Sequence, residues 1–394
     1  MATYKYFTPT KIIFGKDAEM QVGKLLKEQG AKKILLHYGS GSVLRSGLLD
    51  KVKTVLSEED VPYAELGGVV PNPRLSLIRK GIDLVKKEQI DFILAVGGGS
   101  VVDSAKAIGY GAANDGDVWD FYEHTRQPAA CLPLGVILTL AATGSDMSDS
   151  SVITNEEGWK KRGCNSDLCR PRFAILNPEL TLTVSPYQTA CGCTDILMHT
   201  LERYFTAVPT LDVTDRIAEG LMRTVIENAK LLAQEPGNYK ARAEILWANS
   251  LSHNGLTGFG SDGGDWVCHP LEHEMSGLWD VAHGAGLAAI WGSWARYTYK
   301  QNLPRFRKLA LHVLGISEKG TDEEIALRGI EAMESFFHAL RMPVSFRDLG
   351  IEASEEDLDT LARKYAAAVG GQRGSAVKIG EKEAREIYAM AKTR

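Results

Sequence analysis

Three histidines lie close together in the stretch DWVCHPLEHEMSGLWDVAHGAG, which begins at residue 265. They are His269, His273 and His283, one third of the nine histidines in the chain. His269 and His273 are four residues apart, a spacing that places two side chains on the same face of a helix. Grouped imidazoles are ligands of zinc, iron and other transition metals. The stretch is therefore a candidate part of a metal site.

A second pair of suitable ligands lies earlier, in the stretch CTDILMHTLE. Asp195 and His199 are also four residues apart, so both side chains project from one helix face. One carboxylate and three imidazoles form a ligand set suited to Fe(II) or Zn(II). The two stretches offer five candidate side chains, which exceeds the need of one ion. One of the five is expected to act beside the metal rather than on it.

A run of glycines in AVGGGSVVDSAK indicates a binding site for phosphate. A buried strand leads into Gly97, Gly98, Gly99 and Ser100, and a helix follows, with Asp103 in its first turns. Glycines let the backbone approach a ligand closely, and the start of a helix offers free N–H groups and the positive end of its dipole. The pattern is not G-x-G-x-x-G, so the usual dinucleotide-binding fold does not follow from it. It does predict a phosphate cradle.

A second turn of similar character lies in LTLAATGSDMS. It offers the hydroxyl groups of Thr139, Thr143 and Ser148 directly after an apolar run. Ser, Thr and Gly are common in ordinary turns, so this stretch is a weaker indication than the glycine run.

The end of the strand KKILLHYG bears on the choice of cofactor. In NAD-preferring folds an acidic residue near such a strand end binds the ribose 2′-hydroxyl. Here Gly39 is followed by Ser40 and Ser42, with no carboxylate. A 2′-phosphate would not be repelled there and could accept hydrogen bonds from the serines. The turn therefore favours NADP(H).

These turns need a sheet to position them, and the first half of the chain predicts one. Four apolar runs read as strands: KKILLHYG, DFILAVGGG, LGVILTL and RFAILNP. Amphipathic segments such as LLDKVKTVLSEE and VVDSAKAIGYGAA read as helices between them. Alternating strands and helices predict a mostly parallel sheet with helices on both faces, a nucleotide-binding α/β domain over residues 1–184. From residue 185 to 394 the pattern has helical periodicity, which predicts an all-helical domain for metal and substrate.

The composition is typical of a soluble globular protein. The chain has 394 residues, of which 44% are hydrophobic and 24% charged, and this length suggests about two domains. A net charge of -5 argues against nucleic acid or an anionic membrane as the main partner. No apolar run approaches the roughly 18 residues of a membrane span. The N-terminal residues lack the apolar core of a signal peptide, so we expect a cytoplasmic protein.

The chain as a whole resembles the group III, iron-containing (metal-dependent) alcohol dehydrogenases, and most resembles their NADP-dependent butanol dehydrogenase and aldehyde reductase branch. The resemblance rests on FTPTKIIFG, PNPR, GGGSVVDSAKAI, LTLAATGSDMS, the Asp195–His199 pair and the segment from His269 to His283, in that order. It implies hydride transfer between a nicotinamide and a primary alcohol or aldehyde, such as butanol or butanal. It also implies NADP(H), one divalent metal (iron first, zinc or nickel otherwise) and a homodimer.

The resemblance also implies roles for individual residues. It assigns the metal ligands to Asp195, His199, His269 and His283. It leaves His273 beside the metal, where we expect it to be catalytic by relaying a proton to solvent.

Further residues are implied to contact the cofactor, on its phosphates or near its nicotinamide: Gly97, Gly98, Ser100, Asn72, Thr139 and Thr143. Gly39 falls where NAD-preferring relatives carry an aspartate, in agreement with NADP(H). A lysine that reaches the 2′-phosphate or ribose corresponds to Lys161, with Lys160 as the alternative. Trp266 and Phe259 are candidate walls of the substrate pocket.

Three other functions are compatible with parts of the pattern. A glycerol- or polyol-type dehydrogenase would use the same scaffold. A lyase similar to dehydroquinate synthase would need many Lys and Arg residues around the metal, and the helical half is poor in them near the histidines. A non-enzymatic metal-binding protein would leave the glycine turns without a purpose.

Overall fold

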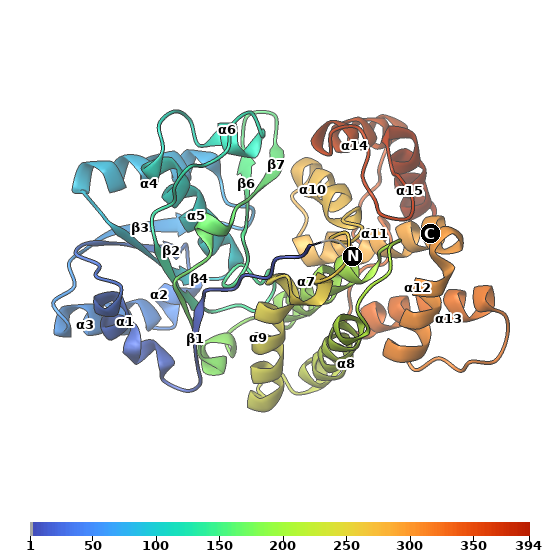
Figure 1. Ribbon diagram of the computed structural model, residues 1–394, viewed down its shortest axis with the longest axis horizontal. Coiled ribbons are helices and arrows are strands. Elements are labelled where there is room, and N and C mark those ends of the chain that lie inside the picture. Colours follow the sequence, from blue (N-terminus) through green and yellow to red (C-terminus); the bar gives the residue numbers. More distant parts are fainter. Residues whose placement is uncertain (1–2) are drawn as a thin grey trace. The chain divides into compact units, whose positions relative to one another are not determined.

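A computed structural model describes residues 3–394 of the chain (Figure 1). The chain divides into two compact units. One contains Phe7–Ser185, and the other contains Pro186–Arg394 together with residues 3–6. The predicted fold class is confirmed, because the first unit is built on a parallel sheet with helices and the second is largely helical.

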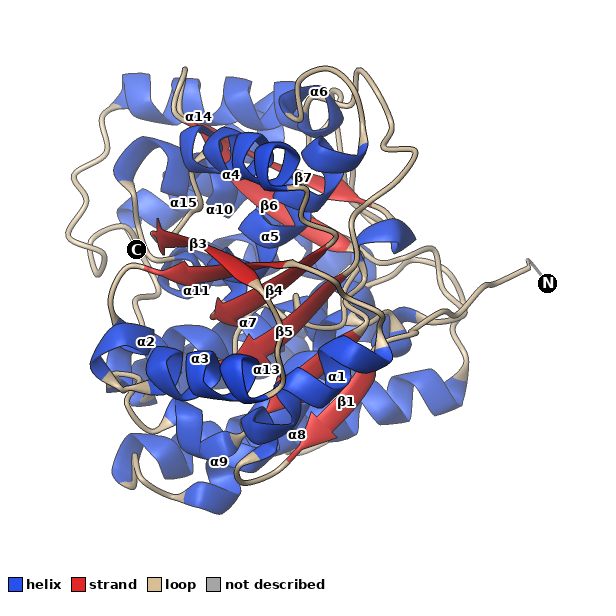
Figure 2. Cartoon of the chain, turned by 90° about the vertical axis from the view of Figure 1, so that its left-hand side faces the viewer, coloured by secondary structure: helices blue, strands red, loops and turns tan. Residues whose placement is uncertain are grey.

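The first unit contains a six-stranded, entirely parallel sheet (Figure 2). Its strand order is β1-β8-β5-β4-β2-β3. The bounds are β1 Lys11–Phe14, β2 Ile34–Gly39, β3 Tyr63–Val69, β4 Phe92–Gly97, β5 Leu134–Leu138 and β8 Phe173–Leu176. All six residues of β4 are buried. A central strand covered on both faces is a continuous apolar run for this reason, and the four strands expected from such runs are confirmed.

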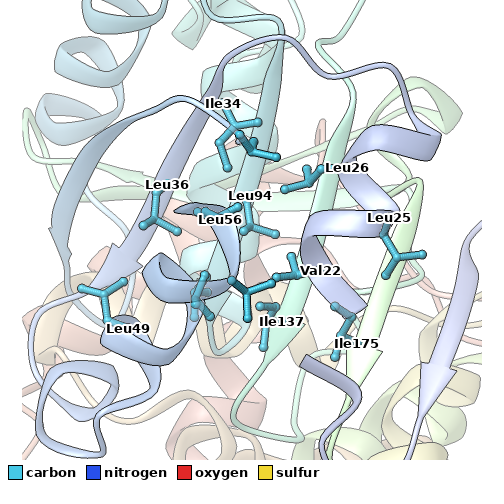
Figure 3. Close-up of a cluster of buried hydrophobic side chains, with 14 of the residues drawn as sticks. Val22, Leu25, Leu26, Ile34, Leu36, Leu49, Leu56, Leu94, Ile137 and Ile175 are labelled. Atoms are coloured by element: carbon cyan, nitrogen blue, oxygen red, sulfur yellow. The ribbon is translucent and has the colours of Figure 1, made fainter. Parts of the chain in front are cut away.

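Helices cover both faces of this sheet (Figure 2). On one face lie α1 (Val22–Glu28), α2 (Ser42–Arg45) and α3 (Leu48–Glu58), and on the other lie α4 (Leu75–Glu88), α5 (Gly99–Ala113) and the short α6 (Trp119–Tyr122). Aliphatic side chains from α1 and α3 meet those of the strands in a closed core (Figure 3), including Val22, Leu26, Leu49, Leu56, Ile34, Leu36, Leu94, Ile137 and Ile175. Removal of this apolar surface from water is the main favourable contribution to the fold of the unit.

The order of the strands brings the three predicted turns to one edge. In the register, Tyr38 of β2 lies opposite Val96 of β4, and Gly97 lies opposite Leu138 of β5. The chain continues from β2 into α2 on one face and from β4 into α5 on the other. Such a reversal of direction opens a crevice at the carboxyl ends of the strands, which is where ligands bind in open α/β sheets.

The second unit consists of helices, and its main helix is α7. The bounds are α7 Pro186–Tyr204, α8 Asp212–Gln234, α9 Tyr239–His253, α10 Cys268–Trp279, α11 His283–Thr298, α12 Leu303–Lys308, α13 Asp322–Ala339, α14 Glu355–Ala368 and α15 Glu381–Thr393, with a π-helical turn at Leu309–Val313. Helix α7 packs against α8, α9 and α11. Among the described residues, no helix combines the length and the apolar character needed to cross a membrane.

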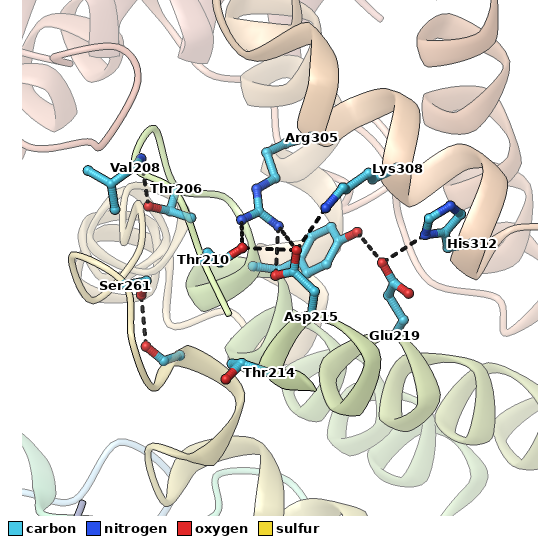
Figure 4. Close-up of polar contacts among 12 residues, drawn as sticks. Thr206, Val208, Thr210, Thr214, Asp215, Glu219, Ser261, Arg305, Lys308 and His312 are labelled. Carbon is cyan, nitrogen blue, oxygen red and sulfur yellow. Dashed lines mark hydrogen bonds and ion pairs between the residues drawn. The ribbon is translucent and has the colours of Figure 1, made fainter. Parts of the chain in front are cut away.

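A buried polar network joins α8 to α12 within this unit (Figure 4). The Asp215 carboxylate accepts hydrogen bonds from Arg305 at 2.8 Å and from Lys308 at 3.0 Å. Burial alone would raise the pKa of Asp215, but these two cations outweigh it and lower the pKa below its usual value. Glu219, one helical turn further, accepts hydrogen bonds from Tyr204 and His312. The network fixes the position of α12 against α8.

Candidate metal centre and nucleotide-binding turns

Four side chains from three helices form a cluster in which three imidazoles surround one carboxylate oxygen. Asp195 and His199 project from the same face of α7, His269 lies in the first turn of α10, and His283 is the first residue of α11. The Oδ1 atom of Asp195 lies 3.4 Å from Nδ1 of His199, 3.5 Å from Nε2 of His269 and 3.6 Å from Nε2 of His283. The structure therefore brings together all four residues for which ligand roles were expected.

The polar atoms at the centre of this cluster fit a metal ion. Oδ1 of Asp195, Nδ1 of His199 and Nε2 of His269 are buried, and none has a hydrogen-bond partner among the described residues. The ligand atoms of these three residues lie within 4.8 Å of one another. A buried polar atom without a partner is costly, and one divalent cation would satisfy all three. The nitrogen and oxygen donors suit Fe(II) or Zn(II).

The electrostatic surroundings differ between two of the imidazoles. Burial lowers the pKa of His199 well below its usual value, and the neighbouring His253 and His269 add to this effect. His199 is therefore neutral, the form that binds metals. Burial also acts to lower the pKa of His269, but the Asp195 and Glu202 carboxylates outweigh it and raise the pKa to about 9. A metal ion would displace a proton from His269 at neutral pH.

Two buried glutamates contact the outer nitrogens of the histidines, and the sequence analysis missed both. Glu202, on α7, accepts a hydrogen bond from Nδ1 of His269 at 3.1 Å. Glu272, on α10, contacts Nδ1 of His283. A signal was present, since Glu202 follows Asp195 by seven residues and so continues the same helix face. Glu272 likewise follows His269 by three residues.

Close helix packing at two glycines brings His283 to the cluster. A Cβ atom built on Gly284 would lie 2.1 Å from the backbone oxygen of Cys191, so α11 touches the backbone of α7 at this point. A Cβ atom on Gly286 would lie 2.8 Å from the Glu272 side chain. The two glycines of AHGAG therefore let the first turn of α11 approach both α7 and Glu272 closely.

His273 lies beside the cluster rather than in it. Its ring centroid is 5.6 Å from that of His283 and 6.5 Å from that of His269. Its side chain is only partly buried. One ring nitrogen of His273 lies near a carboxylate oxygen of Glu272 and a ring nitrogen of His283, and not near the Asp195 group. This placement suits a residue that handles protons near the metal, and its catalytic role stays a prediction.

The surroundings of the cluster are aromatic. The His253 ring, at the end of α9, packs against the His199 ring with centroids 4.0 Å apart and planes tilted by 39°. Trp266 lies 5.4 Å from the ring of His269, and the Arg203 guanidinium covers it at 4.5 Å. Phe259, the other predicted pocket wall, packs edge-on against Tyr4 and Tyr6. His253 has no local sequence pattern that would reveal its position, because it comes from a separate helix.

The glycine run forms a tight junction between β4 and α5. Gly97 ends the strand, Gly98 precedes the helix in an extended conformation, and Gly99 is its first residue. A Cβ atom on Gly99 would lie 2.3 Å from the Thr143 hydroxyl, and the N–H of Thr139 donates to the oxygen of Gly97 at 3.0 Å. Two of the predicted turns are therefore in direct contact. Ser100 and Thr139, like Gly98, keep part of their surface exposed.

Asp103 and Ser148, both expected to contact the cofactor, make hydrogen bonds within the chain. Asp103 accepts hydrogen bonds from Ser145 at 2.6 Å and from the N–H of Val152 at 3.1 Å. Burial raises its pKa, with Lys106 opposing the shift. Ser148 is completely buried, and its backbone oxygen accepts from Lys106 at 3.0 Å. The contact of Asp103 and Ser148 with the cofactor stays a prediction, and these hydrogen bonds show that both residues also hold the turns in place.

The contacts of Asp103 anchor a hairpin that was not predicted, β6 (Ser150–Asn155) with β7 (Lys160–Asn165). On β7, Lys161 is buried, and its charge is close enough to Asp103 to oppose the rise that burial causes in the pKa of Asp103. Lys160 points to solvent and pairs with Glu123 at 3.2 Å. The hairpin therefore favours Lys161 over Lys160 as the lysine that faces the turns.

Asn72 and the end of β2 complete the set of predicted residues. Asn72 has a left-handed backbone (φ 55°), and its turn joins the hairpin through the oxygen of Pro73, which accepts from the N–H of Thr154 at 2.8 Å. After Gly39, Ser40 and Ser42 are exposed. The serine turn thus lies open at the carboxyl end of its strand, as a cofactor contact requires.

Comparison with known proteins places both halves of the chain in one family. Residues 9–178 match the family described as iron-containing alcohol dehydrogenase, and residues 189–391 match the C-terminal part of the Fe-containing alcohol dehydrogenase family. The probable NADH-dependent butanol dehydrogenase 1 of Bacillus subtilis is 44% identical over 93% of this chain and 94% of its own length.

Two further relatives are similar over almost the entire chain. The NADPH-dependent aldehyde reductase YqhD of Escherichia coli is 34% identical over 100% of both chains. The crystal structure of NADH-dependent butanol dehydrogenase A from Thermotoga maritima superposes with a TM-score of 0.95 at 36% identity, covering 99% of each chain.

Proposed function

Because the chain belongs to the iron-containing alcohol dehydrogenase family, an oxidoreductase family, we propose that it is a metal-dependent, NADP(H)-dependent alcohol dehydrogenase and aldehyde reductase. Its proposed substrates are primary alcohols and their aldehydes, such as butanol and butanal. The observation that carries this proposal is the set of unsatisfied buried atoms on Asp195, His199 and His269. One divalent cation at this position would satisfy a carboxylate oxygen and two imidazole nitrogens together.

The residues divide the chemistry between them. Asp195, His199, His269 and His283 would hold the metal, which when bound would make an alcohol more acidic or polarise an aldehyde carbonyl. The nicotinamide would accept or deliver the hydride. His273 would exchange the alcohol proton with solvent, since its imidazole is partly exposed and lies next to the ring of His283.

The α/β unit would hold the cofactor at the carboxyl edge of its sheet. Gly97, Gly98 and Ser100 would contact the phosphates, because the two glycines lead into the start of α5 without side chains and Ser100 lies in its first turn. The hydroxyls of Thr139 and Thr143 would face the nicotinamide, with Asn72 nearby, and Lys161 would reach the ribose or its 2′-phosphate.

The preference for NADP(H) rests on the turn after β2. Gly39, Ser40 and Ser42 present no carboxylate to a 2′-phosphate. In addition, the Arg45 guanidinium lies over this turn, since a Cβ atom on Gly41 would be 2.6 Å from its Nη1 atom. Relatives of this chain are named for either cofactor, so the turn after β2 is the only support for this part of the proposal.

The substitution Gly39→Asp tests the preference for NADP(H). A Cβ atom at this position has no neighbour closer than 3.7 Å, so the side chain fits. We expect the wild type to use NADPH with a higher kcat/KM than NADH, and the variant to reverse this order because the carboxylate repels the 2′-phosphate. A wild type that is more efficient with NADH would contradict the proposal. Butanal, glycerol and dihydroxyacetone in the same assay separate the aldehyde reductase from a polyol dehydrogenase.

We also propose a homodimer. β1 is an edge strand. Phe14, its last residue, is 45% exposed, and Phe7, four residues before its start, is 44% exposed. An open parallel edge with exposed aromatic side chains is suited to pairing with a second copy across a two-fold axis. Light scattering after gel filtration should give twice the chain mass, and the monomer mass would overturn this proposal.

A further inference from the structure

We propose that Glu202 and Glu272 are positioning residues of the metal centre, each orienting one ligand imidazole. Both imidazoles have the same arrangement. Nε2 of His269 and Nε2 of His283 face Oδ1 of Asp195 at 3.5 and 3.6 Å, while their Nδ1 atoms contact Glu202 and Glu272. The proposal rests on the proposed metal site and concerns how strongly and in what geometry that site holds its ion.

Glu202 orients both the ring and the backbone of His269. Its Oε1 atom accepts from Nδ1 of His269 at 3.1 Å and from the backbone N–H of the same residue at 2.9 Å. Its Oε2 atom accepts from the N–H of Val267 at 3.2 Å. One buried carboxylate on α7 thereby holds the first turn of α10. Because Asp195 and His199 project from the same helix, Glu202 fixes His269 directly relative to them.

Glu272, on α10, orients His283 in the same way. Its side chain is completely buried. One of its oxygens contacts Nδ1 of His283 and the other accepts from the Ser276 hydroxyl. Ser276 in turn lies 3.1 Å from the backbone oxygen of Val281, in the loop that leads to His283. The absence of a side chain at Gly286 allows α11 to approach the carboxylate.

The chemical consequence follows from the tautomers of histidine. A carboxylate only accepts, so each Nδ1 must carry a proton that it donates, and the lone pair is left on Nε2. This pairing also fixes the ring orientation and increases the basicity of Nε2 toward a metal. His199 has a different support, since its ring packs against the tilted ring of His253. We therefore expect two of the three imidazoles to depend on a carboxylate partner.

Glu202→Gln and Glu272→Gln test the proposal, with Glu274→Gln as the matched control. Glu274 lies on α10 with Glu272, is equally buried, and pairs with Lys364 at 3.5 Å. The zinc dissociation constant of chelator-stripped protein is measured by competition with a chromophoric chelator. Outer-sphere partners of this kind change metal affinity by about 10–100-fold. We expect the zinc dissociation constant to increase by this factor in Glu202→Gln and Glu272→Gln and to stay unchanged in Glu274→Gln.

The visible spectrum of the cobalt-substituted protein gives a second measurement, because it reports ligand geometry and not stability. We expect altered bands in Glu202→Gln and Glu272→Gln and the wild-type spectrum in Glu274→Gln. Wild-type affinity and spectrum in the first two variants would overturn the proposal, as would equal losses in all three. If Glu272→Gln does not fold, Ser276→Ala removes the second contact of the carboxylate and should weaken zinc binding in the same direction.

The number of zinc ions bound per chain distinguishes this proposal from an alternative in which Glu272 belongs to a second metal site. Glu272, His273 and His283 also offer ligand atoms within 4.8 Å of one another. We expect one zinc ion per chain. Two ions, with the second lost in His273→Ala, would assign Glu272 to a cation of its own and overturn its positioning role. The zinc constants are measured without substrate. They therefore do not depend on the proposed reaction, whose failure would be seen as a metal-loaded protein that reduces no aldehyde.

Discussion

Oδ1 of Asp195 is the atom around which the candidate metal centre is arranged, with three imidazole nitrogens between 3.4 and 3.6 Å away. The four-residue spacings in the sequence predicted which side chains share a helix face, and the resemblance to a family predicted which of them are ligands. Spacing could not predict His253, because its contact with His199 depends on how α9 packs on α7. Nor could it show that Asp103 turns inward, because this depends on a hairpin without an apolar run.

His269→Ala should remove the metal and the activity together. The substitution deletes one imidazole donor and leaves Glu202 without its partner, so the loss of metal affinity should exceed the about 10–100-fold typical of outer-sphere changes. Elemental analysis after gel filtration checks the metal content. A variant that retains one equivalent of metal would show that His269 is not a ligand.

His273→Ala should lower the turnover number without loss of the metal. Because His273 lies beside the cluster, its removal should leave the metal in place and lower kcat by about 10²–10⁴-fold, the range for a general acid or base. Metal analysis and steady-state kinetics on the same preparation give both quantities. If the metal is lost with the activity, His273 is a ligand and the assignment to proton transfer is wrong.

At the scale of elements, the site depends on close contacts between helices and strands. The start of α11 touches the backbone of α7 at Gly284, and the start of α5 touches Thr143 at Gly99. The glycine run predicted a phosphate cradle. The structure adds that the same glycines are required by packing. AHGAG gave no such indication, because its partner is nearly a hundred residues away in the sequence, at Cys191.

Gly284→Ala should displace α11 and weaken metal binding. The new Cβ atom would lie 2.1 Å from a backbone oxygen, which cannot move without shifting α7. Gly220→Ala, in the interior of α8, is the control, since the nearest neighbour of its Cβ atom would be the end of the Arg223 side chain at 4.0 Å. We expect a clear fall in metal affinity and thermal stability for the first variant and a much smaller one for the second. Equal effects would contradict this account of the contact.

His37 should make the stability of the α/β unit depend on pH. Its Nδ1–H donates to the oxygen of Leu66 on β3, and its Nε2 contacts the Ser104 hydroxyl on α5. Burial lowers its pKa from 6.5 to about 4. The unfolded chain therefore binds the extra proton first as the pH falls, so the stabilisation is complete above pH 6.5 and is lost toward pH 4.

This shift corresponds to about 3 kcal/mol in the free energy of unfolding over the whole range. Urea titrations at several pH values should show it, and His37→Gln should reduce the dependence on pH over this interval. The same pH dependence in the wild type and the variant would exclude His37 as its source.

At the scale of the whole molecule, the succession of apolar runs was enough to predict a parallel sheet followed by a helical region. Two edge strands were missed for a physical reason. β3 has the sequence YAELGGV and only its last residue is buried, and β1 has four residues of which none is fully buried. Edge strands lack the cover on both faces that makes a continuous apolar run. The β6–β7 hairpin was missed likewise, since KKRGCN is mostly polar.

The claim on which the account depends is that a metal held by Asp195, His199, His269 and His283 is required for the reaction. The most direct measurement is NADPH-dependent reduction of butanal by protein stripped with a chelator, before and after the return of one equivalent of Fe(II) or Zn(II). We predict that the stripped protein is inactive and that one equivalent restores turnover. Full activity in the metal-free protein would contradict the account.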